Sequence, residues 1–281
     1  MSGNLYLVGT PIGNLGDLTP RAADTLAQAD FIAAEDTRVT LRLLSHLGLK
    51  KPLVSYHEHN KESAGKKILA RLLAGENCAL CTDAGMPCIS DPGQELVALC
   101  AQSGAQVVAI PGPSALVTAL ALSGIAGGRF TFEGFLSVKK GSRQKHLAAL
   151  VAEERTMIFY EAPHKLPATL VDMLATFGER KIALCRELTK LHEETVRTTL
   201  TQAAALFRGD STHKPRGEYV LVIEGAPPAP TKQPVSEEEA VAMVRKLQTT
   251  GLSLSQAAKD VGAATGHRKA ALYKLALRVD S

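Results

Sequence analysis

The first 110 residues alternate short apolar runs with longer segments in which apolar positions recur every three or four residues. Short apolar runs predict buried strands, and the longer period predicts helices with one buried face. Strands are expected at residues 5–8, 31–34, 53–56, 78–81 and 107–110. Helices are expected from Thr19-Pro20 and over 37–47, about 62–73 and 94–102. This alternation predicts a largely parallel, doubly wound sheet.

The second half has a different pattern, in which strands follow one another more closely. Strands are expected at 130–135, 156–160, 182–188, 193–200 and 218–224, with a basic loop at 139–145 and a helix over 163–177. Short connections between the last three strands favour antiparallel pairing. The pattern therefore predicts a second α/β domain with a mixed sheet.

A proline-rich segment at 226–235 follows and reads as a stiff linker of the polyproline type. Three short helices are expected after it, at 236–249, 253–261 and 265–277. Ser236 is the expected N-cap of the first, with Glu239 in the capping-box position. The expected organisation is an α/β domain over 1–112, a second α/β domain over 113–225, the linker, and a small helical domain over 236–281.

Three loops rich in glycine and proline follow strands of the first domain. They are the segments 9–14, 83–93 and 111–115. Ligands of open α/β sheets bind at the carboxyl ends of the strands. We therefore expect the three loops to form one small-molecule site, in which Asp83 and Asp91 supply carboxylates.

Composition narrows the function classes only slightly. The chain of 281 residues is 45% apolar, and its formal net charge is +4. This mild charge permits a polyanionic partner without demanding one. We see no signal peptide and no run near the ~18 apolar residues of a membrane span, so we expect a cytoplasmic enzyme.

Two cysteines form the pair Cys78 and Cys81, a spacing found in zinc and redox sites. No second pair and no histidines at ligand spacing follow, so we predict buried thiols and no metal. Common nucleotide motifs are also absent, since neither a dinucleotide-binding glycine pattern nor a phosphate-binding loop occurs. His57 and His59 have no ligand context, and we interpret them as part of a solvated loop before a helix.

Several motifs together resemble one known family. They are G-T-P-I-G-N-L-G-D-L-T-P-R-A at 9–22, A-E-D-T-R at 34–38, T-D-A-G-M-P-C-I-S-D-P-G at 82–93, P-G-P-S-A at 111–115, F-Y-E-A-P-H-K at 159–165, E-L-T-K at 187–190 and R-G-E-Y-V at 216–220. This set is similar to the tetrapyrrole methylase superfamily and, within it, to the ribosomal RNA small subunit methyltransferase I family. The resemblance covers about residues 4–225, and the helical tail also matches. Met86 and Cys88 stand where small residues are commoner.

The resemblance implies a fold and a reaction. The fold would be the two-domain tetrapyrrole-methylase fold with an added helical domain. The reaction would be methyl transfer from S-adenosylmethionine to the ribose 2′-hydroxyl of a cytidine in the decoding region of 16S ribosomal RNA. It further implies a homodimer. Such a transfer depends on proximity and orientation, and a nearby carboxylate that takes or steers the hydroxyl proton would assist it.

Candidate cofactor residues come from the loops and from one strand end. The resemblance assigns Asp83 to the cofactor, although a turn-forming aspartate is the alternative. Phe159 and Tyr160 end a strand and could cover the cofactor, or they could belong to the core. The strand-end argument adds five more candidates, each of which could serve loop geometry alone: Pro11, Met86, Ile89, Ser114 and Ala115.

Three charged residues follow the second expected strand directly. Glu35, Asp36 and Arg38 read as substrate-side groups, with a carboxylate for the hydroxyl proton and the guanidinium for a phosphate. The alternative is a helix start with acidic residues near its positive end. Lys190 and Arg216 are RNA-phosphate contacts or simple surface charges.

Basic residues in two regions suit an RNA partner. Candidates for RNA contact are Asn14, Lys139, Lys140, Arg143, Lys145, Arg268 and Lys269. The tail resembles a helix-turn-helix, and a solvated small bundle is the alternative. Two rival functions remain at this point: a methyltransferase for a tetrapyrrole-like or other small substrate, and a nucleic-acid-binding module with an inactive cleft.

Overall fold

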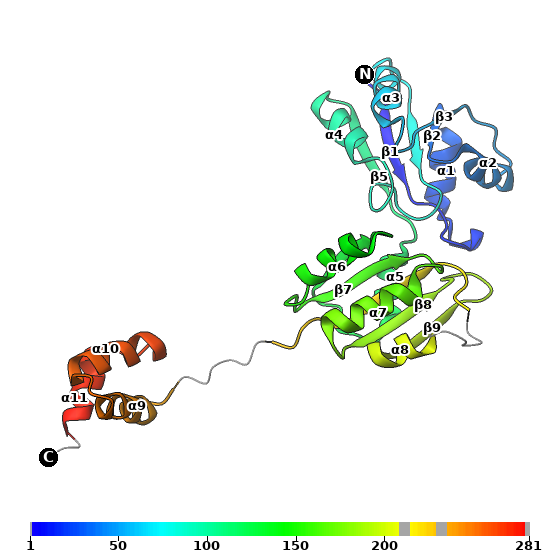
Figure 1. Ribbon diagram of the computed structural model, residues 1–281. Coiled ribbons are helices and arrows are strands. Elements are labelled where there is room, and N and C mark those ends of the chain that lie inside the picture. The colour runs from blue at the N-terminus through cyan, green and yellow to red at the C-terminus, as the bar shows by residue number, and fades with distance from the viewer. Residues whose placement is uncertain (1, 208–213, 229–234, 279–281) are drawn as a thin grey trace. The chain divides into compact units, whose positions relative to one another are not determined.

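The computed structural model describes residues 2–207, 214–228 and 235–278. The chain divides into two compact units, Met1–Ala226 and Pro227–Ser281, which are described separately (Figure 1). The larger unit contains two five-stranded sheets, and the regular elements in the described part of the smaller unit are helices. None of the described helices is long and apolar enough to cross a membrane.

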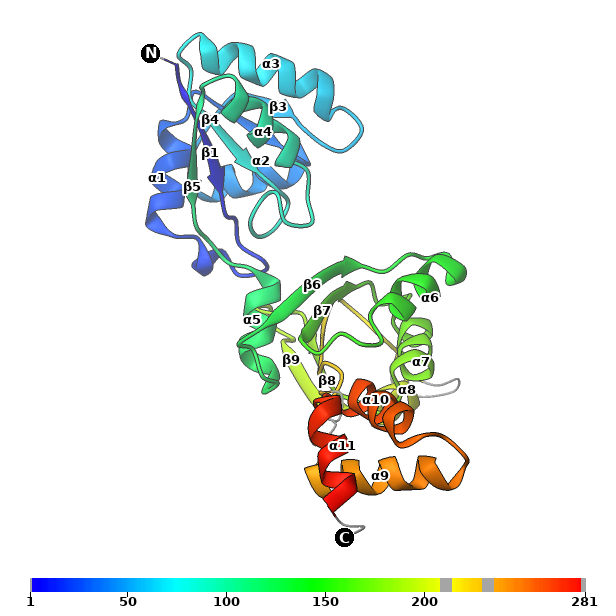
Figure 2. The same cartoon turned by 90° about the vertical axis from the view of Figure 1, so that its left-hand side faces the viewer.

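The first sheet is parallel throughout, with strand order β3-β2-β4-β1-β5. Its strands are β1 Asn4–Val8, β2 Phe31–Ala34, β3 Leu53–Ser55, β4 Cys78–Cys81 and β5 Gln106–Ile110. Four helices cover it: α1 Pro20–Gln28, α2 Thr37–His46, α3 Lys61–Leu73 and α4 Gln94–Gln102. The first two pack on one face and the last two on the other (Figure 2). The predicted doubly wound sheet is confirmed.

Local chemistry explains two details of this sheet. The Thr19 side chain accepts a hydrogen bond from the Ala22 amide at 3.1 Å, so it caps α1 just before Pro20, whose missing N–H costs nothing there. Cys78 and Cys81 lie in the cores on opposite faces of the sheet, because positions three apart on a strand point in opposite directions. No metal-binding group of side chains occurs among the described residues.

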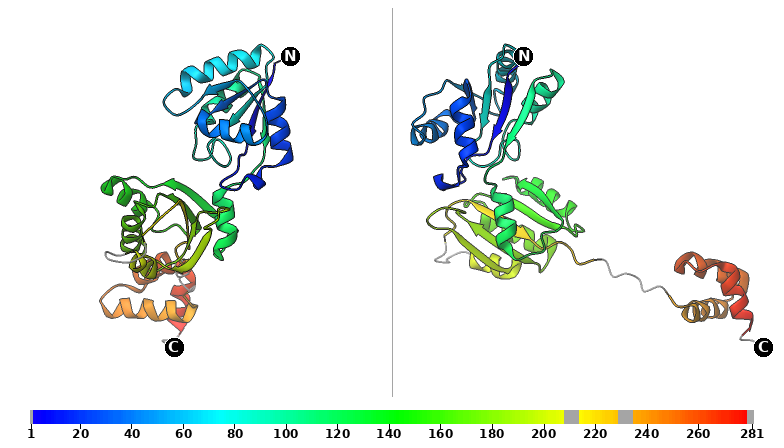
Figure 3. Two further views of the ribbon diagram at one scale, coloured as in Figure 1. Left: turned by 90° about the vertical axis from the view of Figure 1, so that its right-hand side faces the viewer. Right: turned by 180° about the vertical axis from the view of Figure 1, so that it is seen from behind.

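The second sheet is mixed, with strand order β6-β7-β10-β8-β9. Its strands are β6 Phe130–Phe135, β7 Thr156–Glu161, β8 Lys181–Arg186, β9 Glu194–Thr199 and β10 Tyr219–Ile223. Strands β6 and β7 of this sheet pair in parallel. The antiparallel pairing predicted for the last three strands is confirmed, and β10 also pairs antiparallel with β7. One face carries α6 Lys140–Ala149, α7 Leu166–Phe177 and α8 Leu200–Leu206, while α5 Ala115–Ser123 covers the other (Figure 3).

The sequence pattern missed three of these helices and a short 3₁₀ turn. The segment 139–145 was predicted as a loop, but most of it forms the first half of α6. Its glycine and serine suggested a loop, whereas the burial of Arg143 and Leu147, one turn apart, holds it as a helix. Helix α5 is apolar on all sides and so lacks the helical period. Helix α8 and the turn Leu15–Asp17 are too short to show one.

The smaller unit is a three-helix bundle of α9 Glu237–Thr249, α10 Leu254–Thr265 and α11 Lys269–Arg278. The predicted capping box is present, because the Glu239 amide donates to the Ser236 hydroxyl and the Ser236 amide donates to the Glu239 carboxylate. Its core contains Val244, Val261 and Leu272 with four alanines. Within the predicted linker, residues 229–234 lie outside the described part of the chain.

Candidate functional site

Two contacts hold the three loops together at the carboxyl edge of the first sheet. Thr10 and Gly85 form an isolated antiparallel bridge, with amide-to-carbonyl distances of 2.9 and 3.1 Å. Gly9 and Gly112 touch backbone to backbone, and a methyl group added at Gly9 would lie 2.7 Å from the Gly112 Cα. Side chains cannot fit at this contact. The loops therefore form one rigid rim.

This rim forms one wall of a cleft of about 420 Å³ within the larger unit. The opposite wall comes from the ends of β7, β8 and β10. The predicted residues that line the cleft are Met86, Ile89, Asp91, Ser114, Ala115 and Tyr160. The strand-end argument thus brought together residues from both domains.

The N-terminus of α5 reaches this cleft with its cap position unused. Ser114 is the N-cap residue, but its hydroxyl makes no capping hydrogen bond. The Tyr160 hydroxyl accepts a hydrogen bond from the Leu116 amide at 3.1 Å, which ties the strand end to the helix. A free hydroxyl and the first-turn amides of a helix suit a polar or anionic ligand group.

Phe159 does not line the cleft. It is fully buried among the core residues beneath α6 and α7, on the face of β7 opposite to Tyr160. Adjacent residues of a strand point to opposite faces, so only one member of the predicted aromatic pair could face a ligand. The alternative that it belongs to the core describes its position correctly, and we leave Phe159 out of the site.

A second hollow of about 200 Å³ lies beside the same loops. Pro11 and Asp83, which were expected in the cofactor crevice, line this hollow instead. It also contains Arg42, an exposed residue of α2 that sequence reasoning missed. Residues 10–13 and 82–86 contribute to both hollows. Two ligands, one in each hollow, would therefore be separated only by these loops.

Three carboxyl groups gather at this edge, from the ends of β2 and β4. The Asp83 amide donates to Glu35 Oε2 at 3.4 Å, and the Asp36 amide donates to Asp83 Oδ1 at 3.1 Å. Burial, together with the neighbouring charges of Asp83 and Asp36, raises the pKa of Glu35 above its ordinary value. Burial and the charges of Glu35 and Asp83 raise the pKa of Asp91 to about 6. Asp91 can therefore exchange a proton near neutral pH.

Asp36 and Arg38 form an ion pair. The Asp36 carboxylate caps α2 by accepting from the Arg38 amide at 2.8 Å, and the Arg38 Nε donates to it at 3.0 Å. The guanidinium lowers the pKa of Asp36 to about 2, so this carboxylate is a weak base. The helix-start interpretation therefore accounts for Asp36, while Glu35 keeps the properties of a proton acceptor.

The opposite wall contains a buried ionic group that the sequence reasoning did not single out. Glu161 is 1% exposed and accepts hydrogen bonds from the Thr169 hydroxyl at 2.6 Å and the Ala162 amide at 2.9 Å. Lys165 pairs with it at 2.7 Å and lies 5.5 Å from the centre of the Phe135 ring. Lys165 thereby links this network to Phe135, whose ring meets that of Tyr160 edge to face at 5.4 Å in the cleft lining. The motif F-Y-E-A-P-H-K contains both Glu161 and Lys165, so it was the feature of the sequence that could have identified this ion pair.

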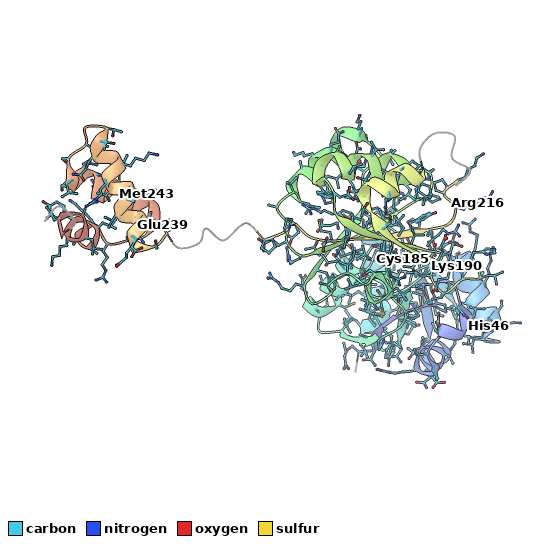
Figure 4. The ribbon with its side chains drawn as sticks, turned by 90° about the horizontal axis from the view of Figure 1, so that it is seen from below. His46, Cys185, Lys190, Arg216, Glu239 and Met243 are labelled. Atoms are coloured by element: carbon cyan, nitrogen blue, oxygen red, sulfur yellow. The ribbon has the colours of Figure 1, made fainter. Side chains whose placement is uncertain are left out.

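Lys190 holds two more carboxylates in the cleft wall. Its Nζ lies 3.0 Å from Glu187 Oε1 and 3.0 Å from Glu218 Oε2. Glu187 and Thr189 adopt positive φ angles of 50° and 66°, which is costly for residues other than glycine. Figure 4 locates Lys190 and Cys185, two lining residues, in the larger unit. The strained loop thus places Glu187 and Lys190 in the lining of the cleft.

The predicted RNA contacts divide into exposed and buried groups. Lys139, Lys140 and Lys145 are exposed around the start of α6. Arg143 is 6% exposed, and its Nε donates to Asp172 of α7 at 2.7 Å. Its Nη1 also donates to the Ser137 and Val138 carbonyls, so its charge is used inside the domain and we leave it out of the RNA surface.

The remaining RNA candidates are exposed. Asn14 uses its side-chain oxygen to accept from the Gly16 amide at 2.9 Å. Arg216 is also exposed. Arg268 and Lys269 are exposed at the start of α11 in the smaller unit.

Comparison with known proteins identifies the class. The family model described as "Tetrapyrrole (Corrin/Porphyrin) Methylases" matches residues 4–204, and "RsmI C-terminal HTH domain" matches residues 234–279. Two solved structures share the fold. A uroporphyrin-III C-methyl transferase from Thermus thermophilus complexed with S-adenyl homocysteine has a TM-score of 0.55 at 19% identity, covering 79% of this chain and 97% of that one. The methyltransferase CobJ has a TM-score of 0.58 at 19% identity, covering 80% and 95%.

Curated relatives match over their full length. A Synechocystis protein named ribosomal RNA small subunit methyltransferase I is 50% identical over 280 residues, covering 99% of each chain. The Haemophilus influenzae protein of the same name is 44% identical over 278 residues, covering 99% of this chain and 97% of the relative. The chain therefore belongs to the ribosomal RNA small subunit methyltransferase I family, within the tetrapyrrole methylases.

Proposed function

We propose that this protein transfers a methyl group from S-adenosylmethionine to the ribose 2′-hydroxyl of a cytidine in 16S ribosomal RNA, in the cytoplasm. Full-length similarity to relatives named for the small ribosomal subunit supports the substrate class. The observation that carries the chemistry is the placement of Asp91 in a ligand-sized cleft with an uncapped helix start, and of Asp83, whose amide donates to Glu35, in the adjoining hollow.

The residues of the larger cleft fit the cofactor. Met86, Ile89, Ala115 and Tyr160 provide apolar contact, and the free Ser114 hydroxyl can pair with a polar group of the ligand. The backbone of the rigid loop rim can approach a ligand closely because its glycines have no side chains. When bound, S-adenosylmethionine supplies an activated methyl group on a sulfonium sulfur.

The carboxylates beside the loops would handle the hydroxyl proton. A C–O bond forms to the ribose oxygen as the C–S bond breaks, and the hydroxyl proton moves to a base. Among the predicted catalytic group, Glu35 is the suitable base, because Asp36 is held by Arg38. Arg38 itself is exposed and, with Arg42, can pair with an RNA phosphate near the smaller hollow.

RNA would be held by exposed cations on both units. Lys139, Lys140 and Lys145 lie around the start of α6, which follows Phe135 at the cleft. Lys269 begins α11, and Arg268 directly precedes it, in the unit that matches a helix-turn-helix family. Phosphate contacts of this kind make binding depend on salt through counterion release.

We propose that the protein acts as a homodimer. Helix α5 has only two polar residues, Thr118 and Ser123, and an all-round apolar helix needs cover on every side. Val117 of this helix is 54% exposed, and Phe130 of the edge strand β6 is 40% exposed. A second copy of the chain would cover such side chains, and the molar mass of the protein in solution tests the proposed dimer.

One experiment tests the reaction. The purified protein is incubated with labelled S-adenosylmethionine and either naked 16S ribosomal RNA or small subunits from cells that lack the protein. We expect label on the ribose of one cytidine, located by nuclease mapping. Label on a base, or on a tetrapyrrole but no RNA, would contradict the proposal.

Asp83 provides a test of cofactor binding. Its carboxylate holds the Asp36 amide and lines the smaller hollow, while the next residue, Ala84, lines the larger cleft. We propose that a cofactor bound in the larger cleft extends past Ala84 to this carboxylate. A charge-assisted hydrogen bond contributes about 1.5–3 kcal/mol, so Asp83→Ala should weaken S-adenosylmethionine binding about ten- to a hundred-fold. Calorimetry measures this affinity, and Asp24→Ala on the exposed side of α1 is the control. Unchanged affinity would remove Asp83 from the cofactor site.

A further inference from the structure

A β-bulge in the edge strand β6 changes the direction of the side chains that follow it. The register of β6 on β7 pairs Phe132 with Ile158 and Gly134 with Phe159, so Glu133 is an extra residue opposite no residue of β7. Gly134 has a φ angle of 64°, which a residue with a side chain adopts only at a cost. An extra residue of this kind bends the strand and re-aims the next side chain, and bulges are common beside active sites.

The bulge brings Phe135 to the same face of the sheet as Phe132. Residues three apart on a regular strand point to opposite faces. Here both rings meet the Tyr160 ring edge to face, at 4.9 Å for Phe132 and 5.4 Å for Phe135. Without the extra residue, Phe135 would point to the face that α6, α7 and α8 cover. With it, Phe135 lines the larger cleft.

Phe135 keeps an open surface although its position is fixed. Its ring meets Tyr160 and lies 5.5 Å from Lys165 Nζ, yet 58% of the residue is exposed. The backbone that follows is held by two buried or half-buried cations. Lys165 Nζ donates to the Leu136 carbonyl at 3.0 Å, and Arg143 Nη1 donates to the carbonyls of the next two residues, each at 3.2 Å. A flat ring that is already fixed can receive a ligand at little cost in entropy.

Exposed cations follow Phe135 along the chain. Lys139, Lys140 and Lys145 are all exposed. The first two stand at the start of α6, whose first turn contains no acidic residue and whose N-cap makes no side-chain hydrogen bond. Because a helix start is itself positive, these charges are unfavourable in the free protein and favour an anionic partner. A flat apolar ring followed by cations complements a nucleic-acid strand, which offers flat bases and phosphates.

We propose that Phe135 is a contact residue for the ribosomal RNA, on which an unpaired base near the methylated ribose stacks while Lys139, Lys140 and Lys145 hold the phosphates of the same strand. This inference rests on the proposed function. The surface selects a single strand, because a paired base presents no free face to an aromatic ring. The stacked base would hold the strand at the mouth of the cleft.

The first test uses fluorescence. The chain contains no tryptophan, so Phe135→Trp introduces the sole tryptophan at the cleft. A stacked base quenches tryptophan emission, so a single-stranded RNA from the decoding region should quench it. The same strand annealed to its complement offers phosphates without free bases and should quench it little. Phe130→Trp, at the other end of β6, is the matched control and should respond to neither RNA.

Three results of this test would overturn the inference. Quenching by S-adenosylmethionine with none by RNA would assign the ring to the adenine of the cofactor. Equal quenching by the single-stranded and the annealed RNA would show that phosphate contacts alone bring the RNA there. An emission that no RNA changes would show that the ring is not an RNA surface, as it would be if a second copy of the chain covered it.

The second test measures affinity. Phe135→Leu keeps an apolar side chain and removes the flat ring. Stacking on an aromatic side chain contributes about ten- to a hundred-fold in affinity, so the Kd for the single-stranded RNA should rise by that factor. The calorimetric affinity for S-adenosylmethionine and the melting temperature should stay unchanged, and Phe135→Tyr should restore the RNA affinity. An unchanged Kd for RNA in Phe135→Leu, or an equal loss of cofactor affinity, would contradict stacking.

Failure of this inference and failure of the proposed function are distinguishable. If single-stranded RNA quenches the emission but no methyl group reaches an RNA ribose, the proposed function fails and the stacking contact stands. If a ribose is methylated while RNA leaves the emission unchanged, the stacking contact fails and the proposed function stands.

Discussion

Asp91 is a carboxylate whose ionised form the fold disfavours. Its pKa rises from 3.8 to about 6 through burial and the charges of Glu35 and Asp83. A raised carboxyl pKa in the folded state means that stability falls as pH increases from about 4 through 6. The residue therefore costs stability at neutral pH, as is common for groups kept for function.

Replacing this carboxylate should make the protein more stable at neutral pH and slower in methyl transfer. We expect Asp91→Asn to gain about 1–2 kcal/mol above pH 6, after allowance for solvent contact, and nothing below pH 4. Thermal melting as a function of pH measures the gain, and Asp24→Asn on the exposed side of α1 is the control. A gain that is equal at pH 4 and pH 7 would contradict the assigned cause.

Individual site residues were predictable only in part. Met86, Ile89, Ser114 and Ala115 follow strands in the chain, so the strand-end rule placed them at the cleft. Glu161 and Lys190 each also use a partner outside their own motif, Thr169 and Glu218 respectively. Phe159 failed because the side on which a strand-end residue points depends on one residue of register.

Helix α6 depends on an ion pair with a distant residue. Arg143 donates to Asp172 of α7, and Gln144 Nε2 donates to the other carboxylate oxygen at 3.2 Å. Both ionic groups are less than 10% exposed. Because the partner lies 29 residues along the chain, local sequence suggested a loop, whereas the strands and helices of the first domain follow from their own periods.

Breaking this pair should destabilise the protein. Removing one member of a buried pair costs about 3–5 kcal/mol, so Arg143→Met should lower the melting temperature strongly. Lys145→Met on the exposed side of the same helix is the matched control and should change it little. Salt dependence of RNA binding should decrease in Lys145→Met only. Equal melting temperatures for both variants would exclude the structural role of Arg143.

Across the chain, the order of elements predicted most of the architecture. The parallel sheet, the mixed sheet and the three terminal helices were expected from apolar periods and from Ser236 with Glu239, and the structure confirms them. The pairing of β6 with β7 in parallel could not be read from sequence, because their connection contains the unforeseen α6.

The larger unit should fold without the terminal bundle. The Ala226 amide donates to the Glu153 carbonyl at 2.6 Å, so a chain that ends after Pro228 keeps this last contact. We expect normal melting and cofactor affinity from it, because the cofactor candidates precede residue 226. Methyl transfer to small subunits should fall if the bundle holds RNA. Full activity would show that the bundle does not hold RNA. A much lower melting temperature would show that the bundle stabilises the larger unit.

The contact between Gly9 and Gly112 has a consequence for variation at these positions. Each backbone occupies the volume that the other's side chain would need, since a methyl group at Gly112 would lie 2.8 Å from the Gly9 carbonyl oxygen. Neither a larger cleft nor a compensating change elsewhere restores that volume without parting β1 and β5, which are paired along their whole length. In a library randomised at both codons, selection for methyl transfer should return the double glycine alone. The geometry of the loop rim would then tolerate no residue other than glycine at either position.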